Sequence, residues 1–398
     1  MLRLVPALLG AAGCGAPAIH PGRSPGIDRH PGVRDLYDLA EATRARIGLP
    51  AVGLGIVHRG RVLGLGMAGE RTAGSGLWAT LDDLFEVASC SKSVTATVAA
   101  ILVERGTVRW QTTLADAFPE LRTSMRPAFA PVTLEQLLRH RSGLGHELNR
   151  NVRWSGWHRR HAHLTAAEQR FAFAADALRR PPRSAPGTGT FYTSDGYVVA
   201  GSLLERAAGV EWNLLVRTLL FEPLGLRSIG HDVDARRGFT AATGHEPGVF
   251  GWPRAIPHDP DEYGPRPFGA PAGFMYATVP DLLRYVDFHI QGEHGRAPLL
   301  QPASFRRLHR ALDGDTAALG WMSEVRLDAD GRVVEHSVFH GGYSGVARAN
   351  MWFVPETQWG TAIVVNDGRG DEAIASEIFY DLLREFGVVP RAPEALPG

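Results

Sequence analysis

The chain has 398 residues, 44% hydrophobic and 21% charged, and its 42 basic residues balance 42 acidic ones. This composition excludes an intrinsically disordered chain, a fibrous repeat, and binding to nucleic acid or an anionic membrane through bulk charge. Only two cysteines are present, Cys14 and Cys90, which excludes a framework of disulfides. Of the 42 basic residues, 41 are arginine and one is lysine, Lys92, so this position calls for a chemical reason.

The first residues have the pattern of an export signal. One basic residue, Arg3, precedes an apolar run from Leu4 to Leu9, and small residues then lead to Cys14. This pattern resembles a short secretory signal that ends in a lipobox, with Cys14 as the lipidated residue. We therefore expect residues 1–32 to be a signal and flexible tether. The protein would then be an exported lipoprotein of the periplasm or cell envelope.

The next elements alternate between helix and strand. Apolar residues at helical spacing predict a helix over Val33–Ile47. Two β-rich runs, Ala51–Val57 and Arg61–Met67, are joined by His58–Gly60 and predict a hairpin. The chain from Leu81 to Leu312 is then mostly helical, and none of its apolar runs approaches the length of roughly twenty residues that a membrane-spanning helix needs.

Strand character returns near the end of the chain, and a final helix is expected over Asp371–Phe386. The late strands are predicted at Gly320–Val325, Val333–Phe339, Ala349–Val354 and Gly360–Val365. Strands at both ends around a helical middle predict an α+β fold, in which terminal helices flank one antiparallel sheet and a mostly helical insertion packs against it.

We assign one catalytic domain to residues 33–390. Residues 33–80 and 313–390 form its sheet part, residues 81–312 form its mostly helical part, and residues 391–398 form a tail. An active site is expected in the cleft between the two parts.

The candidate nucleophile and base lie at the start of one helix. Val94, Val98 and Ile101 have helical spacing, so Ser89 lies at the helix N-terminus and Lys92 lies on the same face one turn later. A serine hydroxyl needs a neighbouring base, and a lysine can be that base whereas an arginine cannot lose its proton. The alternatives are a helix N-cap for Ser89 and a solvated charge for Lys92. The second is disfavoured because this chain makes its other basic charges from arginine.

From about Leu36 to Phe386 the sequence resembles the serine beta-lactamase and penicillin-binding protein superfamily, in particular its class C-like branch of beta-lactamases, D-alanyl peptidases and esterases. The family's Ser-x-x-Lys matches Ser89 and Lys92. Its helical-domain signature matches Leu137–Leu144, its Tyr-x-Asn motif falls on Tyr192–Ser194, and its Lys-Thr-Gly or His-x-Gly motif falls on His340–Gly342. The resemblance implies the beta-lactamase/transpeptidase-like fold.

The resemblance also implies roles for these residues. Ser89 would attack the acyl carbon, and Lys92 and the Tyr192 phenol would share its proton and pass it to the leaving group. The backbone N–H groups of Ser89 and Tyr343 would form an oxyanion hole. His340 would line the cleft with Gly341 and Gly342 and hold a substrate carboxylate or carbonyl. The alternatives are a core aromatic for Tyr192 and a structural strand histidine for His340.

One position departs from the family pattern. Ser194 stands where most relatives carry asparagine, which holds the acylamide side chain of the substrate in lactamases and peptidases. Serine is shorter and offers a single hydroxyl. This change leaves the nucleophile intact but favours ester hydrolysis over the recognition of beta-lactams or peptidoglycan peptides.

Two segments beside the expected cleft carry weaker signals. The basic and tryptophan-containing stretch Arg150–His163 lies in an insertion between Gly145 and Pro186, which we interpret as a solvated flap rather than a nucleic-acid site. Its histidines, His158, His161 and His163, have too few carboxylate partners for a convincing metal site. The loop Gly244–Ala272 is expected to form the opposite wall.

The sequence therefore predicts a serine hydrolase that acts through an acyl-enzyme on a small-molecule acyl substrate, with neither a metal nor an organic cofactor. Carboxylic esters are the first expectation for the substrate, D-amino-acid peptides or amides the second, and beta-lactams the third. A catalytically silent protein that binds cell-wall peptides is the alternative from another class.

Overall fold

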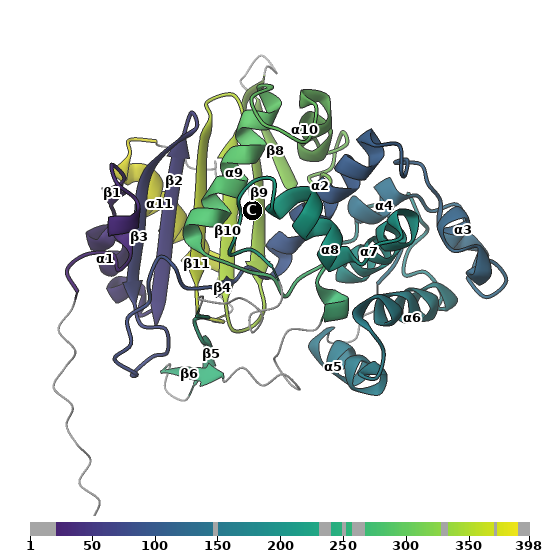
Figure 1. Cartoon of the computed structure of the whole chain (residues 1–398), viewed down its shortest axis with the longest axis horizontal. Helices are drawn as coiled ribbons and strands as arrows, with labels where there is room; N and C mark the ends of the chain where they lie inside the picture. Colours follow the sequence, from purple (N-terminus) through teal and green to yellow (C-terminus); the bar gives the residue numbers. More distant parts are fainter. Residues whose placement is uncertain are drawn as a thin grey trace, which may run out of the picture.

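The computed structural model describes residues 21–145, 150–230, 240–248, 252–256, 267–327, 333–369 and 372–388. Cys14 and the predicted signal lie outside these residues. Figure 1 shows a sheet built from both ends of the chain, with a helical part beside it. Among the described residues, no helix combines the length and the apolar character needed to cross a membrane.

The main sheet has seven strands in the order β1-β3-β2-β11-β10-β9-β8. The strands are β1 (Arg34–Asp35), β2 (Ala51–His58), β3 (Arg61–Gly69), β8 (Met322–Leu327), β9 (Val333–Tyr343), β10 (Arg348–Val354) and β11 (Trp359–Val365). All neighbours are antiparallel except β1 and β3. The α+β prediction is confirmed, but the sheet is mixed because of the short strand β1.

The start of the first helix differs from the prediction. Arg34 and Asp35 pair with Gly64 and Leu65 of β3, so the helix α1 begins at Tyr37 and not at Val33. Helical periodicity continues back to residue 33, but pairing with a neighbouring strand outweighs it there.

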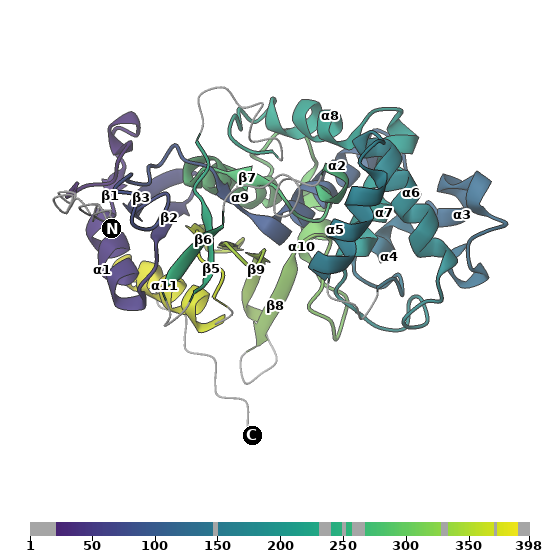
Figure 2. The same ribbon diagram turned by 90° about the horizontal axis from the view of Figure 1, so that it is seen from below.

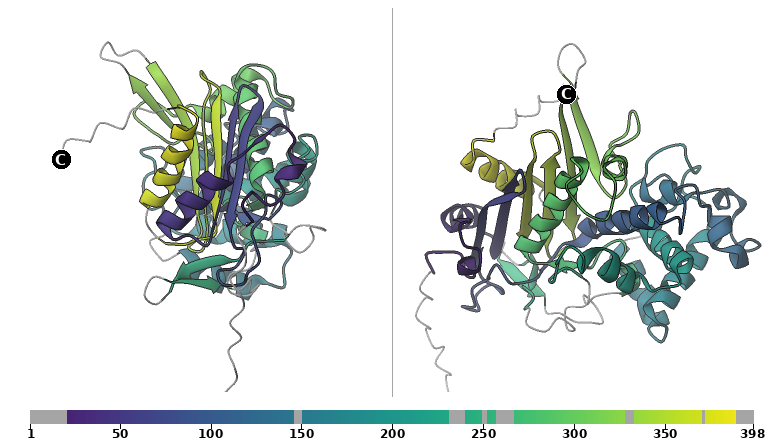
Figure 3. Two further views of the ribbon diagram at one scale, coloured as in Figure 1. Left: turned by 90° about the vertical axis from the view of Figure 1, so that its left-hand side faces the viewer. Right: turned by 45° about the horizontal axis from the view of Figure 1, so that its top comes forward.

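Helices cover both faces of the sheet. α1 (Tyr37–Ile47) and α11 (Glu372–Glu385) lie on one face and α9 (Val279–Glu293) lies on the other, as the left view of Figure 3 shows. Each face buries its own apolar cluster, since side chains alternate between the two faces along every strand. The α9 face is the one that meets the helical part.

The helical part extends from one end of the sheet, with α3 at the end of the molecule opposite to α1 (Figure 2). Its helices are α2 (Ser91–Glu104), α3 (Leu114–Ala117), α4 (Leu134–Leu138), α5 (Arg150–His161), α6 (Ala166–Arg179), α7 (Ser194–Ala208), α8 (Trp212–Val216) and α10 (Pro302–His309). Residues 91–102 of α2 are buried, so α2 is a central helix of this part.

Short elements complete the described chain. Single-turn helices lie at Ile27–Arg29, Ala88–Cys90, Pro119–Leu121, Pro127–Phe129 and Pro267–Gly269, and a π-helix lies at Arg217–Phe221. Two small pairings join β4 (Phe85–Glu86) with β7 (Tyr276–Ala277), and β5 (Gly244–Pro247) with β6 (Pro253–Ile256). The loop predicted as the opposite wall thus contains a hairpin, and its residues 249–251 and 257–266 lie outside the described ones.

The insertion after Gly145 differs from the flap that we expected. Residues 150–179 form α5 and α6, and Thr165 caps α6 with a capping box that includes Glu168. Trp157 is 4% exposed and packs against Phe173 and Phe268. Trp157 is therefore a core residue, and the interpretation as a solvated flap was wrong for this part of the stretch.

Candidate active site

Ser89 lies in a tight turn that leads into α2. The preceding residue, Ala88, has a φ of 43°, in the left-handed region that residues other than glycine rarely adopt. The Ser91 hydroxyl donates to the Ala88 carbonyl at 2.6 Å and so holds this turn closed. Ser89 itself is 8% exposed. A backbone conformation of this kind persists where the surrounding structure imposes it, and such residues cluster at functional sites.

Lys92 is fully buried directly beneath Ser89. Its Nζ lies 3.0 Å from Ser89 Oγ, 3.2 Å from Ser194 Oγ and 2.7 Å from the Ala272 carbonyl oxygen. Because a carbonyl can only accept, Lys92 donates one N–H to Ala272, while the bonds to the two hydroxyls can run in either direction. A neutral amine in this position can therefore accept the proton of Ser89.

Tyr192 stands at the opening of the same site. Tyr192 is 42% exposed, and the centre of its ring lies 4.9 Å from Lys92 Nζ. The next residue, Thr193, caps α7 by accepting the Asp195 N–H at 3.1 Å. The N-terminal end of α7 thus places both Tyr192 and Ser194, the first residue of that helix, next to Lys92.

His140 holds Tyr192 in place, a role that the sequence did not reveal. Its Nδ1 accepts the Thr193 N–H at 3.1 Å, and its ring centre lies 4.4 Å from that of Tyr192. Burial, together with the nearby Lys92 and His340, holds the pKa of His140 well below its usual value, so the acceptor nitrogen stays unprotonated. The one sequence signal for this role was that His140 lies in Leu137–Leu144, the segment that matches the family's helical-domain signature.

The edge of β9 forms the opposite side of the site. β8 pairs with β9 only as far as Phe339, so residues 340–343 extend beyond it. The Cys90 thiol donates to the His340 carbonyl at 3.3 Å. A Cβ built on Gly342 would lie 2.2 Å from the Val87 carbonyl oxygen, so only glycine permits this approach. The strand is therefore packed against the turn that carries Ser89.

His340 is a neutral group in this cleft. It is 3% exposed, and burial together with the charge of Lys92 lowers the pKa of His340 to about 3. Its Nδ1 lies 2.8 Å from the Gly341 carbonyl oxygen and must donate to it, which leaves Nε2 as an acceptor. The centre of its ring lies 6.3 Å from that of Tyr192. Neutral His340 offers no positive charge to a substrate carboxylate.

The remaining predicted residues lie at the rim. The Tyr343 phenol donates to the Gly368 carbonyl at 2.9 Å, which ties its partly exposed side chain to a neighbouring loop. Gly341 is exposed, and a Cβ built on it meets nothing within 4 Å. Cys90 lies beside Ser89, but burial raises the pKa of its thiol to about 12, which makes it a poor nucleophile.

The histidines of the insertion make local contacts. His158 Nδ1 lies 3.0 Å from the Gln169 side-chain oxygen, and His161 Nδ1 lies 2.8 Å from the Trp157 carbonyl. Within the described residues, no group of three or more histidine, cysteine or acidic side chains is placed to hold a metal ion.

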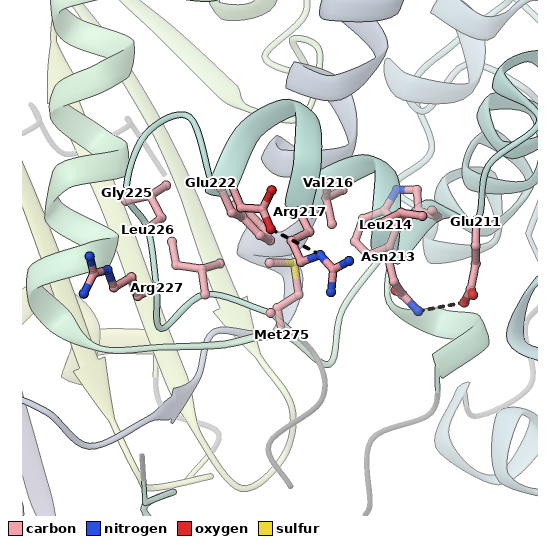
Figure 4. Close-up of a pocket in the computed structure, with 14 residues that line it drawn as sticks. Glu211, Asn213, Leu214, Val216, Arg217, Glu222, Gly225, Leu226, Arg227 and Met275 are labelled. Atoms are coloured by element: carbon pink, nitrogen blue, oxygen red, sulfur yellow. Dashed lines mark hydrogen bonds and ion pairs between the residues drawn. The ribbon is translucent and has the colours of Figure 1, made fainter. Parts of the chain in front are cut away.

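A separate hollow of about 760 Å³ lies between the α8 segment and Met275 (Figure 4). Arg217 pairs with Glu222 there, and the Asn213 amide donates to Glu211. Its described lining contains no serine, cysteine, histidine or lysine, so it lacks the chemistry found around Ser89.

Comparison with known proteins identifies relatives over most of the chain. The family model described as Beta-lactamase matches residues 36–383. Penicillin-binding protein 4 of Amycolatopsis lactamdurans is 29% identical over 357 residues, which cover 87% of each chain. Esterase EstB of Burkholderia gladioli is 28% identical over 311 residues, which cover 72% of this chain and 76% of the esterase.

A solved structure shares the fold. The octameric penicillin-binding protein homologue from Pyrococcus abyssi superimposes with a TM-score of 0.71 at 21% identity, covering 89% of this chain and 77% of the homologue. The arrangement of sheet and helical part described above is therefore that of a known fold.

Proposed function

Because this chain belongs to the beta-lactamase family of serine hydrolases, we propose that it cleaves small acyl compounds through an acyl-enzyme on Ser89. The observation that carries this proposal is the buried contact of 3.0 Å between Lys92 Nζ and Ser89 Oγ, beneath the ring of Tyr192. Lys92 is the single lysine of the chain, and it lies where a base is needed.

In the acylation step, Ser89 Oγ attacks the acyl carbon while its proton passes to neutral Lys92. The carbonyl electron pair moves to the oxygen, which the backbone N–H groups of Ser89 and Tyr343 stabilise. When the tetrahedral species collapses, the bond to the leaving group breaks. The leaving group takes up the proton, which Lys92 and the Tyr192 phenol deliver.

Hydrolysis of the acyl-enzyme reverses these roles. A water molecule loses its proton to the same pair and attacks the acyl carbon, and the bond to Ser89 Oγ breaks as that oxygen recovers a proton. His140 keeps Tyr192 at the opening through both steps, since it anchors Thr193 on one side and packs on the ring itself.

Uncharged carboxylic esters are the substrates that these residues favour. Because His340 is neutral it offers no positive charge to a substrate carboxylate, and Ser194 is bonded to Lys92 where an asparagine would reach toward an acylamide group. Esterase EstB among the relatives agrees with this choice. D-amino-acid peptides or amides are the second candidates and beta-lactams the third.

The test is labelling with a fluorophosphonate probe, read by intact mass and peptide mapping. We expect one adduct on Ser89 in the wild-type chain and none in Ser89→Ala. A panel of short-chain nitrophenyl esters, D-alanyl peptides and a chromogenic cephalosporin then ranks the substrate classes by kcat/KM.

A folded wild-type protein without any adduct would reject the proposal and favour a silent cell-wall-peptide binder. An adduct on Ser89 together with a higher kcat/KM for the cephalosporin than for the esters would keep the acyl-enzyme and reject the ester assignment.

A further inference from the structure

The segment from Gly187 to Tyr192 contains neither helix nor strand, and its middle is exposed. Two backbone bonds hold its ends against the loop after α4. The Gly187 N–H donates to the Arg141 carbonyl at 2.8 Å. The Phe191 N–H donates to the His140 carbonyl, also at 2.8 Å. The exposed middle of this segment, which leads to the phenol of the candidate site, therefore depends on side-chain contacts.

Asp315 supplies these contacts from the sheet part of the molecule. Its Oδ2 accepts a hydrogen bond from the Thr190 hydroxyl and a second one, at 3.2 Å, from Arg141 Nη1. Arg141 Nη2 donates in turn to the Gly187 carbonyl at 2.6 Å. One carboxylate oxygen thus holds the segment before Tyr192 twice, directly through Thr190 and indirectly through Arg141.

The carboxylate is itself held in one orientation at the edge of the main sheet. Asp315 Oδ1 accepts the N–H groups of Thr316 and Ala317 at 2.8 and 3.1 Å. The Thr316 carbonyl accepts the N–H of Ser323 on β8 at 2.8 Å. Burial opposes ionisation of Asp315, but its hydrogen bonds, that from Thr190 first, outweigh burial and hold its pKa below the usual value. A charged acceptor of fixed direction therefore reaches from the sheet part to the segment that carries the phenol.

We propose that Asp315 is a positioning residue for Tyr192. It fixes the segment before the phenol and so keeps the phenol where it passes a proton to the leaving group. The contact between Lys92 and Ser89 forms within another segment of the chain, so it does not depend on Asp315. This role rests on the proposed function, in which Tyr192 helps to deliver the proton.

The leaving group distinguishes this role from a general structural one. When the tetrahedral species of an alkyl ester collapses, the bond between the acyl carbon and the alkoxy oxygen breaks, and that oxygen must take up the proton that Ser89 lost. A nitrophenolate is stabilised by its ring and departs as an anion. A displaced Tyr192 should therefore slow alkyl esters more than nitrophenyl esters of the same acid. Damage to the nucleophile or to the fold would slow both esters alike.

The test measures kcat/KM of the full chain for ethyl butyrate and nitrophenyl butyrate, since this constant reports on the steps up to acylation. Asp315→Ala should lower the value for the ethyl ester about tenfold and that for the nitrophenyl ester at most about twofold, the scale of a small misplacement of a reacting group. Tyr192→Phe should shift the ratio of the two esters in the same direction. The double variant should match Tyr192→Phe, because a positioning residue has no effect once the group that it positions is gone.

Two further variants and a control locate the effect. Thr190→Val removes the hydroxyl that reaches Asp315 and keeps the shape, so it should lower the ratio of ethyl to nitrophenyl ester about threefold, the scale of one hydrogen bond. Thr190→Ser keeps the hydroxyl and should retain the wild-type ratio. Glu135→Ala is the matched control, since the Glu135 carboxylate likewise joins distant segments, α4 and α10, through Arg307 at 2.8 Å. Its ratio should equal that of wild type at any melting temperature.

A wild-type ratio in Asp315→Ala would overturn the proposal, and so would additive losses in the double variant. Should Asp315→Ala fail to fold, the pair at the exposed Thr190 decides, and equal ratios for Thr190→Val and Thr190→Ser would overturn the proposal. Absence of fluorophosphonate label on Ser89 in the folded wild-type chain would refute the proposed function and this role with it. An unchanged ratio in a protein that is labelled refutes the role alone, so the two failures are distinguishable.

Discussion

The two faces of the main sheet are built by different rules. Beneath α1 and α11 the buried residues are almost all apolar, with Thr43 and Thr361 as the polar exceptions. Beneath α9 and α2 an apolar cluster surrounds a fully buried lysine, hydroxyls and two histidines. Buried polar groups cost stability unless each is hydrogen-bonded. The second face meets this requirement through the hydrogen bonds of Lys92 and of the His289–His309 pair, whereas the first face is built almost entirely from apolar contacts.

This contrast separates the effects that substitutions should have. A change on the α11 face should lower the free energy of unfolding and leave the reaction alone. A change among the polar groups of the α2 face should alter the reaction more than the stability.

The largest effect is expected for Lys92. Lys92→Arg keeps the positive charge, but a guanidinium stays protonated at any working pH and cannot act as a base. We expect both Lys92→Arg and Lys92→Ala to lower the acylation rate by about 10²- to 10⁴-fold, the usual range for loss of a general base. The rate of single-turnover acylation with a nitrophenyl ester measures this.

Thermal melting must accompany these rates, because arginine is bulkier than the buried lysine that it replaces. A folded Lys92→Arg protein that acylates at nearly the wild-type rate would show that Lys92 acts through its charge or its packing. The interpretation of the single lysine would then be wrong.

Ile378→Ala tests the opposite face. Ile378 on α11 is 1% exposed within the apolar cluster, and removing such a side chain costs about 2–5 kcal/mol of unfolding free energy. At a temperature well below the transition we expect kcat/KM for a nitrophenyl ester to stay at the wild-type value. Denaturant unfolding and initial rates measure the two quantities, and a loss of activity in the fully folded variant would contradict the separation of the two faces.

The sequence predicted the fold well because its signals are local. Alternation of apolar residues placed the strands of the main sheet to within a few residues, except for β1, whose two residues form a strand only through pairing with β3. The segment after Gly145 failed because Trp157 looked exposed in a basic stretch. Its burial comes from packing against Phe173 on α6 and the more distant Phe268, which no local pattern shows.

The sequence predicted those contacts of the candidate site that lie within a single motif on one segment of the chain. Ser89 lies in the turn that leads into α2 and Lys92 lies in the first turn of that helix, so their contact follows from their spacing. His140 and the Ala272 carbonyl reach the same site from other segments, and no local pattern reports such contacts. The same holds for the buried contacts of His289 on α9 with His309 on α10 and with Thr97 on α2.

The smallest effect is expected at Ser194, where the polar face meets the substrate. Ser194→Asn adds an amide beside Lys92, which can pair with an acylamide group but offers nothing to a simple ester. We expect kcat/KM to rise for acylamide-bearing D-peptides relative to nitrophenyl esters by about tenfold, the scale of one added polar contact. Ser194 Oγ also bonds to Lys92 at 3.2 Å, so a general loss of rate can accompany the change. The quantity to measure is therefore the ratio of the kcat/KM values for the two substrates.

Ser194→Ala is the matched control, since it removes the hydroxyl without adding an amide and should leave that ratio near its wild-type value. Equal changes for both substrates in Ser194→Asn would mean that this position supports the lysine and does not recognise the acyl side chain.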